Sequence, residues 1–89
     1  MSSKTAKWQI TGHRPELVGG RIGAARLTED DDKALHKLIR MSGVKSLRYS
    51  YDQTKTTFTM VIEGEEGQCM IFLNSLFWQA SYFIKPERL

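Results

Sequence analysis

The sequence predicts an α+β fold in which one helix packs on an antiparallel β-meander of three to four strands, with a short N-terminal edge strand. A capped amphipathic segment at 28–42 indicates the helix, and apolar residues that alternate with period two after residue 45 indicate the meander. The 89 residues, 40% of them apolar and 26% charged, are typical of a single small domain over 1–89. We divide it into a basic strand and Gly-rich loop (1–27), the helix (28–42) and the meander (45–84).

The N-terminal part of the chain predicts a strand followed by a loop. Residues 7–13 alternate around Trp8 and Ile10, which is the pattern of a short strand. Pro15 has no N–H for a sheet ladder and is expected to end it. Residues 14–27 hold three closely spaced glycines and are predicted to form a long loop, which in so small a domain is usually functional or mobile.

The segment 28–42 carries the signals that begin and end a helix. Thr28 is a favourable N-cap, and Asp31 three residues later completes a pair that resembles a capping box. Acidic residues fill the first turn, where the helix dipole favours negative charge. Gly43 is suited to the left-handed C′ position that ends a helix. The apolar stripe comprises Ala34, Leu35, Leu38 and Ile39.

The second half of the chain predicts strands. Residues 45–51 and 56–63 alternate and are joined by a polar turn, which indicates a hairpin. A second turn leads to an apolar strand at 68–73. Residues 75–84 are compatible with a strand, which the two-residue period favours, or with a helix capped by Asn74 or Ser75.

The positive charge of the chain is concentrated in its first third. Residues 1–26 carry a net charge of +4, whereas residues 27–89 carry −1. This asymmetry predicts an anionic partner for the N-terminal segment. Such a segment can lie along a phosphate backbone while Trp8 stacks on a base; alternatively it is a solvated arm with Trp8 in the core. The candidate binding residues are Lys4, Lys7, Trp8, Arg14, Arg21 and Arg26.

Two short stretches resemble ligand-binding loops of known families. Gly20-Arg21-Ile22-Gly23 resembles the GxxG loop with which KH domains clamp nucleic acid, but a KH loop joins two helices, whereas a Pro-containing segment precedes this one. The stretch from Ile10 to Gly20 resembles the first strand and loop of the Rossmann-like SLOG proteins, which bind nucleotide-type ligands. That likeness spans about a third of the chain and lacks the second glycine-rich strand end, so the function is not carried over.

The chain offers no constellation for catalysis or metal binding. The two histidines are His13 and His36, and no acidic ligands accompany them in the sequence. The acids at 30–32 point about 100° apart on a helix and suit capping better than magnesium. Cys69 stands alone in an apolar run, as a buried hydrophobe does. We therefore expect no enzymatic activity, no cofactor, no metal, no membrane association and a cytoplasmic location.

Three functions are compatible with these features. We expect a small accessory protein that binds and modulates a larger protein, such as a virus- or mobile-element-encoded factor acting on a host nucleic-acid-processing machine. Direct nucleic-acid binding through the basic segment is the alternative, and a nucleotide-type ligand domain around residues 12–23 is a second alternative. Self-association as a homo-dimer also remains open. The candidate protein interface comprises Arg48, Phe77, Trp78 and Phe83.

Overall fold

The computed structural model describes residues 4–89 and confirms an α+β fold. It differs from the prediction in having two helices and a five-strand antiparallel sheet. Along the chain the elements are β1 (Thr5–Val18), β2 (Arg21–Ala25), α1 (Glu29–Ser42), β3 (Lys45–Tyr51), β4 (Phe58–Glu65), α2 (Glu66–Trp78) and β5 (Phe83–Arg88).

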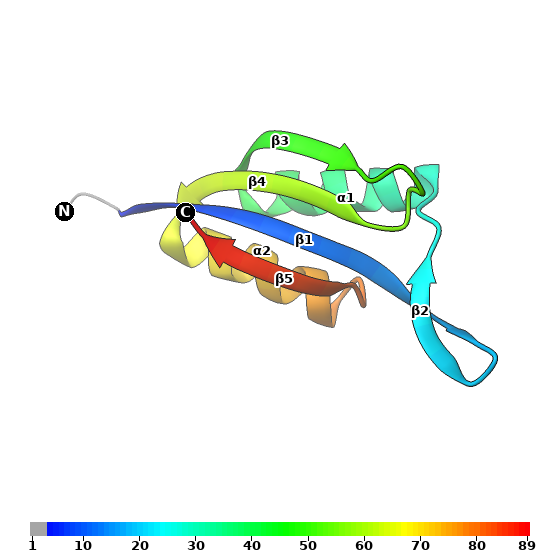
Figure 1. Cartoon of the computed structure of the whole chain (residues 1–89). Coiled ribbons are helices and arrows are strands. Elements are labelled where there is room, and N and C mark those ends of the chain that lie inside the picture. The colour runs from blue at the N-terminus through cyan, green and yellow to red at the C-terminus, as the bar shows by residue number, and fades with distance from the viewer. Residues whose placement is uncertain (1–3) are drawn as a thin grey trace.

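Strand β1 lies inside the sheet and organises it (Figure 1). Its residues 5–12 pair with β4 on one side, and its residues 8–13 pair with β5 on the other. β3 pairs with the far side of β4 and forms an edge. The prediction of a short N-terminal edge strand is therefore wrong, because the partners of β1 come from distant parts of the sequence.

The continuation of β1 forms a hairpin with β2 that extends beyond the body of the protein (Figure 1). Gly19 and Gly20 connect the strands with φ angles of 58° and 79°, as a two-residue type I′ turn requires. Pro15 is tolerated because β1 has β2 alone as its neighbour from residue 14 onward. The predicted loop at 14–27 is thus mostly a hairpin.

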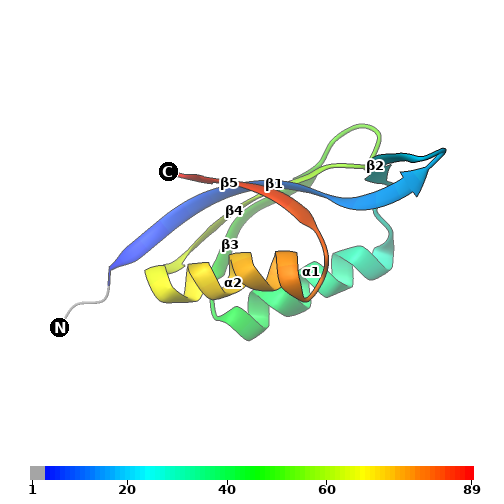
Figure 2. The same cartoon turned by 90° about the horizontal axis from the view of Figure 1, so that it is seen from below.

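Both helices pack on the same face of the sheet, so the opposite face is uncovered (Figure 2). The two-residue alternation of β1 and β4 turns their large apolar side chains toward the helices. The helices contribute the other half of this single core. Its fully buried large side chains are Ile10, Leu35, Phe58, Met60, Ile62, Cys69, Phe72 and Leu76.

The predicted helix at 28–42 is confirmed as α1. Thr28 caps it, and the side chain of Asp31 accepts a hydrogen bond from the Thr28 N–H, which makes a capping box. Gly43 closes the helix with φ of 75°, a left-handed conformation that costs a glycine little.

The predicted strands at 68–73 and 75–84 are wrong for most of their length. Residues 66–78 form α2, and the strand at the end of the chain begins at Phe83. The buried positions of α2 recur at helical spacing. Many of its exposed positions are also apolar, so the sequence shows no contrast between a polar and an apolar side that would reveal a helix. The buried residues of α2 are Cys69, Phe72, Leu73 and Leu76.

The predicted hairpin in the middle of the chain is confirmed as β3 and β4, with one local difference. A register shift between Ser46 and Arg48 leaves Leu47 as a bulge residue that is 43% exposed. The alternation of residues 45–51 predicts that Leu47, Tyr49 and Tyr51 share one face. Tyr49 and Tyr51 do pack against the core, whereas Leu47 does not.

The carboxylate of Asp31 joins three separate parts of the fold. It accepts a hydrogen bond from the Tyr82 hydroxyl at 2.8 Å and from the guanidinium of Arg14 at 3.3 Å, in addition to its capping bond with Thr28. Burial alone would raise the pKa of Asp31, but these hydrogen bonds outweigh it and hold the pKa below its usual value.

Gly12 and Gly67 provide a matched pair of glycine substitutions with opposite expected effects. A Cβ at Gly12 would lie 2.6 Å from Phe58 Cζ, so Gly12→Ala should destabilise the fold by about 1–3 kcal/mol. Gly67 lies in the first turn of α2, where an added Cβ would meet no atom within 4 Å beyond its chain neighbours and its own helix backbone, so Gly67→Ala should stabilise by about 0.5–1 kcal/mol. Urea unfolding measures both, and equal effects would contradict the packing of Phe58 over β1.

Asp31→Asn should lower the free energy of unfolding by about 1–3 kcal/mol at neutral pH, because it weakens charge-assisted bonds to a buried group. A depressed folded-state pKa contributes stability above the unfolded-state value of about 3.9, and this contribution is lost as the pH falls toward the folded-state value. The difference between wild type and Asp31→Asn should therefore shrink below about pH 4. Urea midpoints measured from pH 7 to pH 3 test this, and a difference independent of pH would refute it.

Candidate functional site

The basic residues of the N-terminal segment are distributed along β1, β2 and the residues that flank them. Arg14 and Arg26 are brought together, because the Arg14 guanidinium donates a hydrogen bond to the backbone carbonyl of Arg26 at 3.5 Å. Lys7 and Arg14 each form an ion pair within the fold. Lys7 Nζ lies 3.8 Å from the carboxylate of Glu63, and the Arg14 guanidinium lies 3.3 Å from the carboxylate of Asp31. Lys4 precedes β1, Arg21 begins β2 at the hairpin turn, and Arg26 is exposed between β2 and α1. The segment is mainly the central strand of the sheet rather than a free arm.

Trp8 packs against the core from the helix side of β1 and is partly buried. Its Nε1 is buried and has no hydrogen-bond partner among residues 4–89. The indole therefore contributes mainly to packing, and it is not presented beside the exposed cations as a stacking platform would be.

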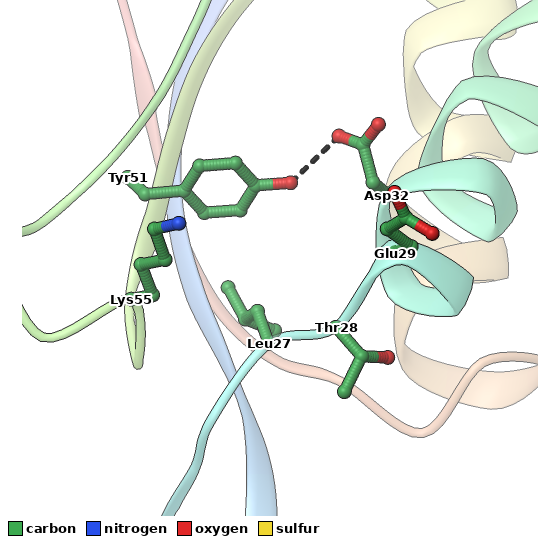
Figure 3. A pocket seen from close by; sticks show the side chains of 6 residues that line it. All are labelled: Leu27, Thr28, Glu29, Asp32, Tyr51 and Lys55. Atoms are coloured by element: carbon green, nitrogen blue, oxygen red, sulfur yellow. Dashed lines mark hydrogen bonds between the residues drawn. The ribbon is translucent and has the colours of Figure 1, made fainter.

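A shallow pocket of about 220 Å³ lies where α1 begins (Figure 3). Tyr51 points across it and donates a hydrogen bond of 2.6 Å to Asp32, while Glu29 and Lys55 lie at its rim. Burial and the bond to Asp32 raise the pKa of Tyr51, so its hydroxyl stays protonated and acts as a donor. This arrangement ties the β3–β4 hairpin to α1.

In the part of the chain that the structure describes, the potential metal ligands are dispersed and the thiol of Cys69 is buried. Within residues 4–89 no group of three or more histidine, cysteine, aspartate or glutamate side chains is placed to hold a metal ion. Cys69 is fully buried, and burial raises the pKa of its thiol, which disfavours the reactive thiolate.

A cluster of large apolar side chains remains exposed along α2 and the start of β5. The rings of Phe77 and Trp78 meet edge to face at 5.2 Å, and Phe77 stacks on Phe83 at 6.3 Å. Trp78 is 76% exposed, which is high for a tryptophan. We call this cluster the aromatic surface; it comprises Met70, Ile71, Phe77, Trp78 and Phe83.

The aromatic surface arises because α2 is apolar on both sides. One side fills the core, while the chain contains no charged residue between Glu66 and Lys85 to solvate the other. Three of the four predicted interface residues thus lie together. Arg48 is separate: its neighbour Tyr49 faces the helices, so Arg48 points from β3 to the uncovered side of the sheet, opposite Val61.

Several exposed apolar residues were absent from the predicted interface. Met70 and Ile71 belong to the apolar strand predicted at 68–73, and the helical spacing of their buried neighbours was the signal that could have placed them outside. At the hairpin turn, Leu17, Val18 and Ile22 are between 62% and 74% exposed. The Gly-Gly pair was the sequence signal for that hairpin.

Comparison with known proteins places the chain in no family: no protein-family model and no curated protein matches it. Neither helix in residues 4–89 has the length and hydropathy needed to cross a membrane.

The two tryptophans should report separately on the aromatic surface and the core. Trp78→Phe leaves Trp8 as the fluorophore, and its emission should be blue-shifted and shielded from acrylamide, because it is partly buried. Trp8→Phe leaves the 76% exposed Trp78, whose emission should be red-shifted and strongly quenched. Similar quenching of both variants would contradict this placement of α2.

Proposed function

We propose that this chain is a small non-enzymatic accessory protein that binds and modulates a larger protein through the aromatic surface. The observation that carries the proposal is the exposure of two aromatic side chains on α2 and a third on β5, within a stretch that has no charge. Aromatic residues are enriched at protein interfaces, and charged residues are depleted at their centres.

The size of the exposed surface supports this role. At roughly 150–250 Å² per aromatic side chain, the exposed parts of Phe77, Trp78 and Phe83 amount to about 350 Å². Met70 and Ile71 enlarge this area. Contiguous apolar patches of a few hundred Å² on soluble proteins often mark interaction sites, because leaving them in water is unfavourable.

A groove beside the aromatic surface extends it toward α1. The groove has a volume of about 330 Å³, and Gln79 and Ala80, which follow Trp78 directly, form one wall. Leu38 and Met41 of α1 form the other, with Lys37 at the same site. A partner centred on Trp78 could therefore also place an apolar side chain in the groove and an acidic group near Lys37.

Replacing Phe77 and Trp78 together with serine should reduce partner binding more than tenfold, since central aromatic contacts often contribute about 2 kcal/mol or more each. Leu17→Ser is the matched control, because Leu17 is 74% exposed but lies on the distant hairpin. Quantitative affinity capture from a lysate of the native cells measures retention of each partner. Equal retention by the double variant and the control would overturn the proposal.

Sedimentation of the purified chain across a range of concentrations distinguishes a larger partner from a second copy. A monomer is expected at micromolar concentration. A dimer that the double serine variant abolishes would instead assign the aromatic surface to self-association, and the proposal of a larger partner would fail.

A further inference from the structure

The uncovered face of the sheet contains a second site, remote from the core side of the molecule. A shallow pocket of about 360 Å³ is formed by β1, β5 and the residue just before β4. Register places Thr11 opposite Lys85 and His13 opposite Phe83. Because Ile10 and Gly12 face the core, the intervening Thr11 and its neighbour His13 face the uncovered side.

Hydrogen-bond donors cross the sheet in a row that ends at this pocket. Thr59 of β4 pairs with Thr11 on one side and with Ser50 of β3 on the other. Lys85 of β5 continues the row beyond Thr11. Neighbouring strands lie about 4.8 Å apart, so the row presents three hydroxyl groups and one ammonium group across about 14 Å of surface.

The polar groups in the pocket are not used by the fold. Within residues 4–89, the side chains of Thr11, His13, Thr57 and Lys85 make no hydrogen bond or ion pair with another residue. No carboxylate lines the pocket. Lys85 therefore has no neighbouring acid in the pocket to neutralise it.

Acids and bases both lie near the pocket. Asp52 contacts one of its lining residues, because the Asp52 carboxylate accepts a hydrogen bond from the backbone N–H of Thr57 at 3.2 Å. Glu63, an acid on the same face, pairs with Lys7 at 3.8 Å and lies opposite Lys45. Glu87 lies opposite Gln9, one row away from Lys85. Arg48 adds a further cation on β3, opposite Val61 in the row of Gln9. A chain of anions crossing the strands would therefore meet cations at both edges of the sheet.

The pocket combines these donors with an aromatic wall. Phe83 is 41% exposed, and its ring contacts the His13 ring edge to face at 5.6 Å. An aromatic base can pack against this pair while a phosphate attached to it accepts hydrogen bonds from Lys85 and a threonine hydroxyl. Stacking of a base on an aromatic side chain contributes about 1–3 kcal/mol and tolerates any base.

We propose that this pocket and the adjoining row bind single-stranded nucleic acid. One base packs on Phe83 and His13, its phosphate contacts Lys85, Thr11 and Thr57, and the strand continues across Thr59 and Ser50 toward Arg48. This activity goes beyond the proposed binding of a protein and does not depend on it. The two sites share Phe83, but Thr11, Thr57 and Lys85 line the pocket alone, whereas Trp78 and the groove are not part of it.

Fluorescence anisotropy of labelled single-stranded DNA, single-stranded RNA and duplex DNA tests the proposal. Wild type should bind the single strands more tightly than the duplex. Lys85→Ala should weaken binding of every single-stranded sequence and lower the salt slope by about 0.7, the value for one lost phosphate contact. Thr11→Val, which keeps the side-chain shape and removes the hydroxyl, should also weaken binding.

Charge-reversal variants distinguish binding in the pocket from general electrostatic attraction between the protein and the nucleic acid. Lys85→Glu and Lys37→Glu change the net charge equally, but Lys37 lies on α1 beside the groove. Lys85→Glu should weaken single-strand binding about tenfold more than Lys37→Glu. Equal loss from both variants, or no binding by wild type at low salt, would overturn the proposal.

Competition with adenosine monophosphate shows whether the site binds a nucleic-acid strand or a single free nucleotide. The strand should compete far better than the mononucleotide at equal nucleotide concentration, because it also contacts the row beyond the pocket. Equal competition would mean that the pocket holds a single nucleotide, and the proposal of a strand would fail. Trp78→Ser keeps the stacking of Phe77 on Phe83 and should bind the strand as tightly as wild type, because Trp78 does not line the pocket. A loss as large as that of Lys85→Glu would contradict the placement of the strand in the pocket.

Discussion

The fold depends on the interactions of one buried carboxylate. Asp31 is the single buried charged residue among residues 4–89, and it is 5% exposed. A buried charge is tolerated when its hydrogen bonds are satisfied, and removing one partner is costly because the charge remains. Arg14 on β1, Thr28 before α1 and Tyr82 before β5 must therefore all be in place together. The hairpin end of the sheet, the start of α1 and the approach to β5 are thus positioned by one group.

The elements that the sequence predicts correctly have local signals. Thr28, Asp31 and Gly43 mark the two ends of α1 within the segment itself, and the alternation of Phe58, Met60 and Ile62 is complete within β4. α2 could not be found in this way, because its exposed side is as apolar as its buried side. The central place of β1 is not local either, since it depends on pairing with strands more than forty residues away.

The residues of the candidate sites also fall into those that local sequence signals identify and those that only the fold brings together. Phe77, Trp78 and Phe83 were identifiable because too many aromatic residues lie near one another for so small a core to bury. Met70 and Ile71 required the knowledge that residues 66–78 are helical. The pocket on the uncovered face could not be predicted, because Thr11 and Lys85 meet only through the pairing of β1 with β5. The two proposed sites lie mainly on opposite layers of the protein and meet at Phe83, which stacks on Phe77 and also lines the pocket.

The position of β1 between β4 and β5 also has a consequence for synthesis on the ribosome. Residues 5–13 leave the exit tunnel before their pairing partners, so their hydrogen-bonding groups stay unpaired until residues 58–65 and then residues 83–88 have emerged. During that interval the nascent chain carries an unpaired strand and an apolar segment destined for α2, which are features that favour aggregation. Because non-local pairing also slows folding, we expect nascent chains of this protein to need shielding by a chaperone until β5 has joined the sheet.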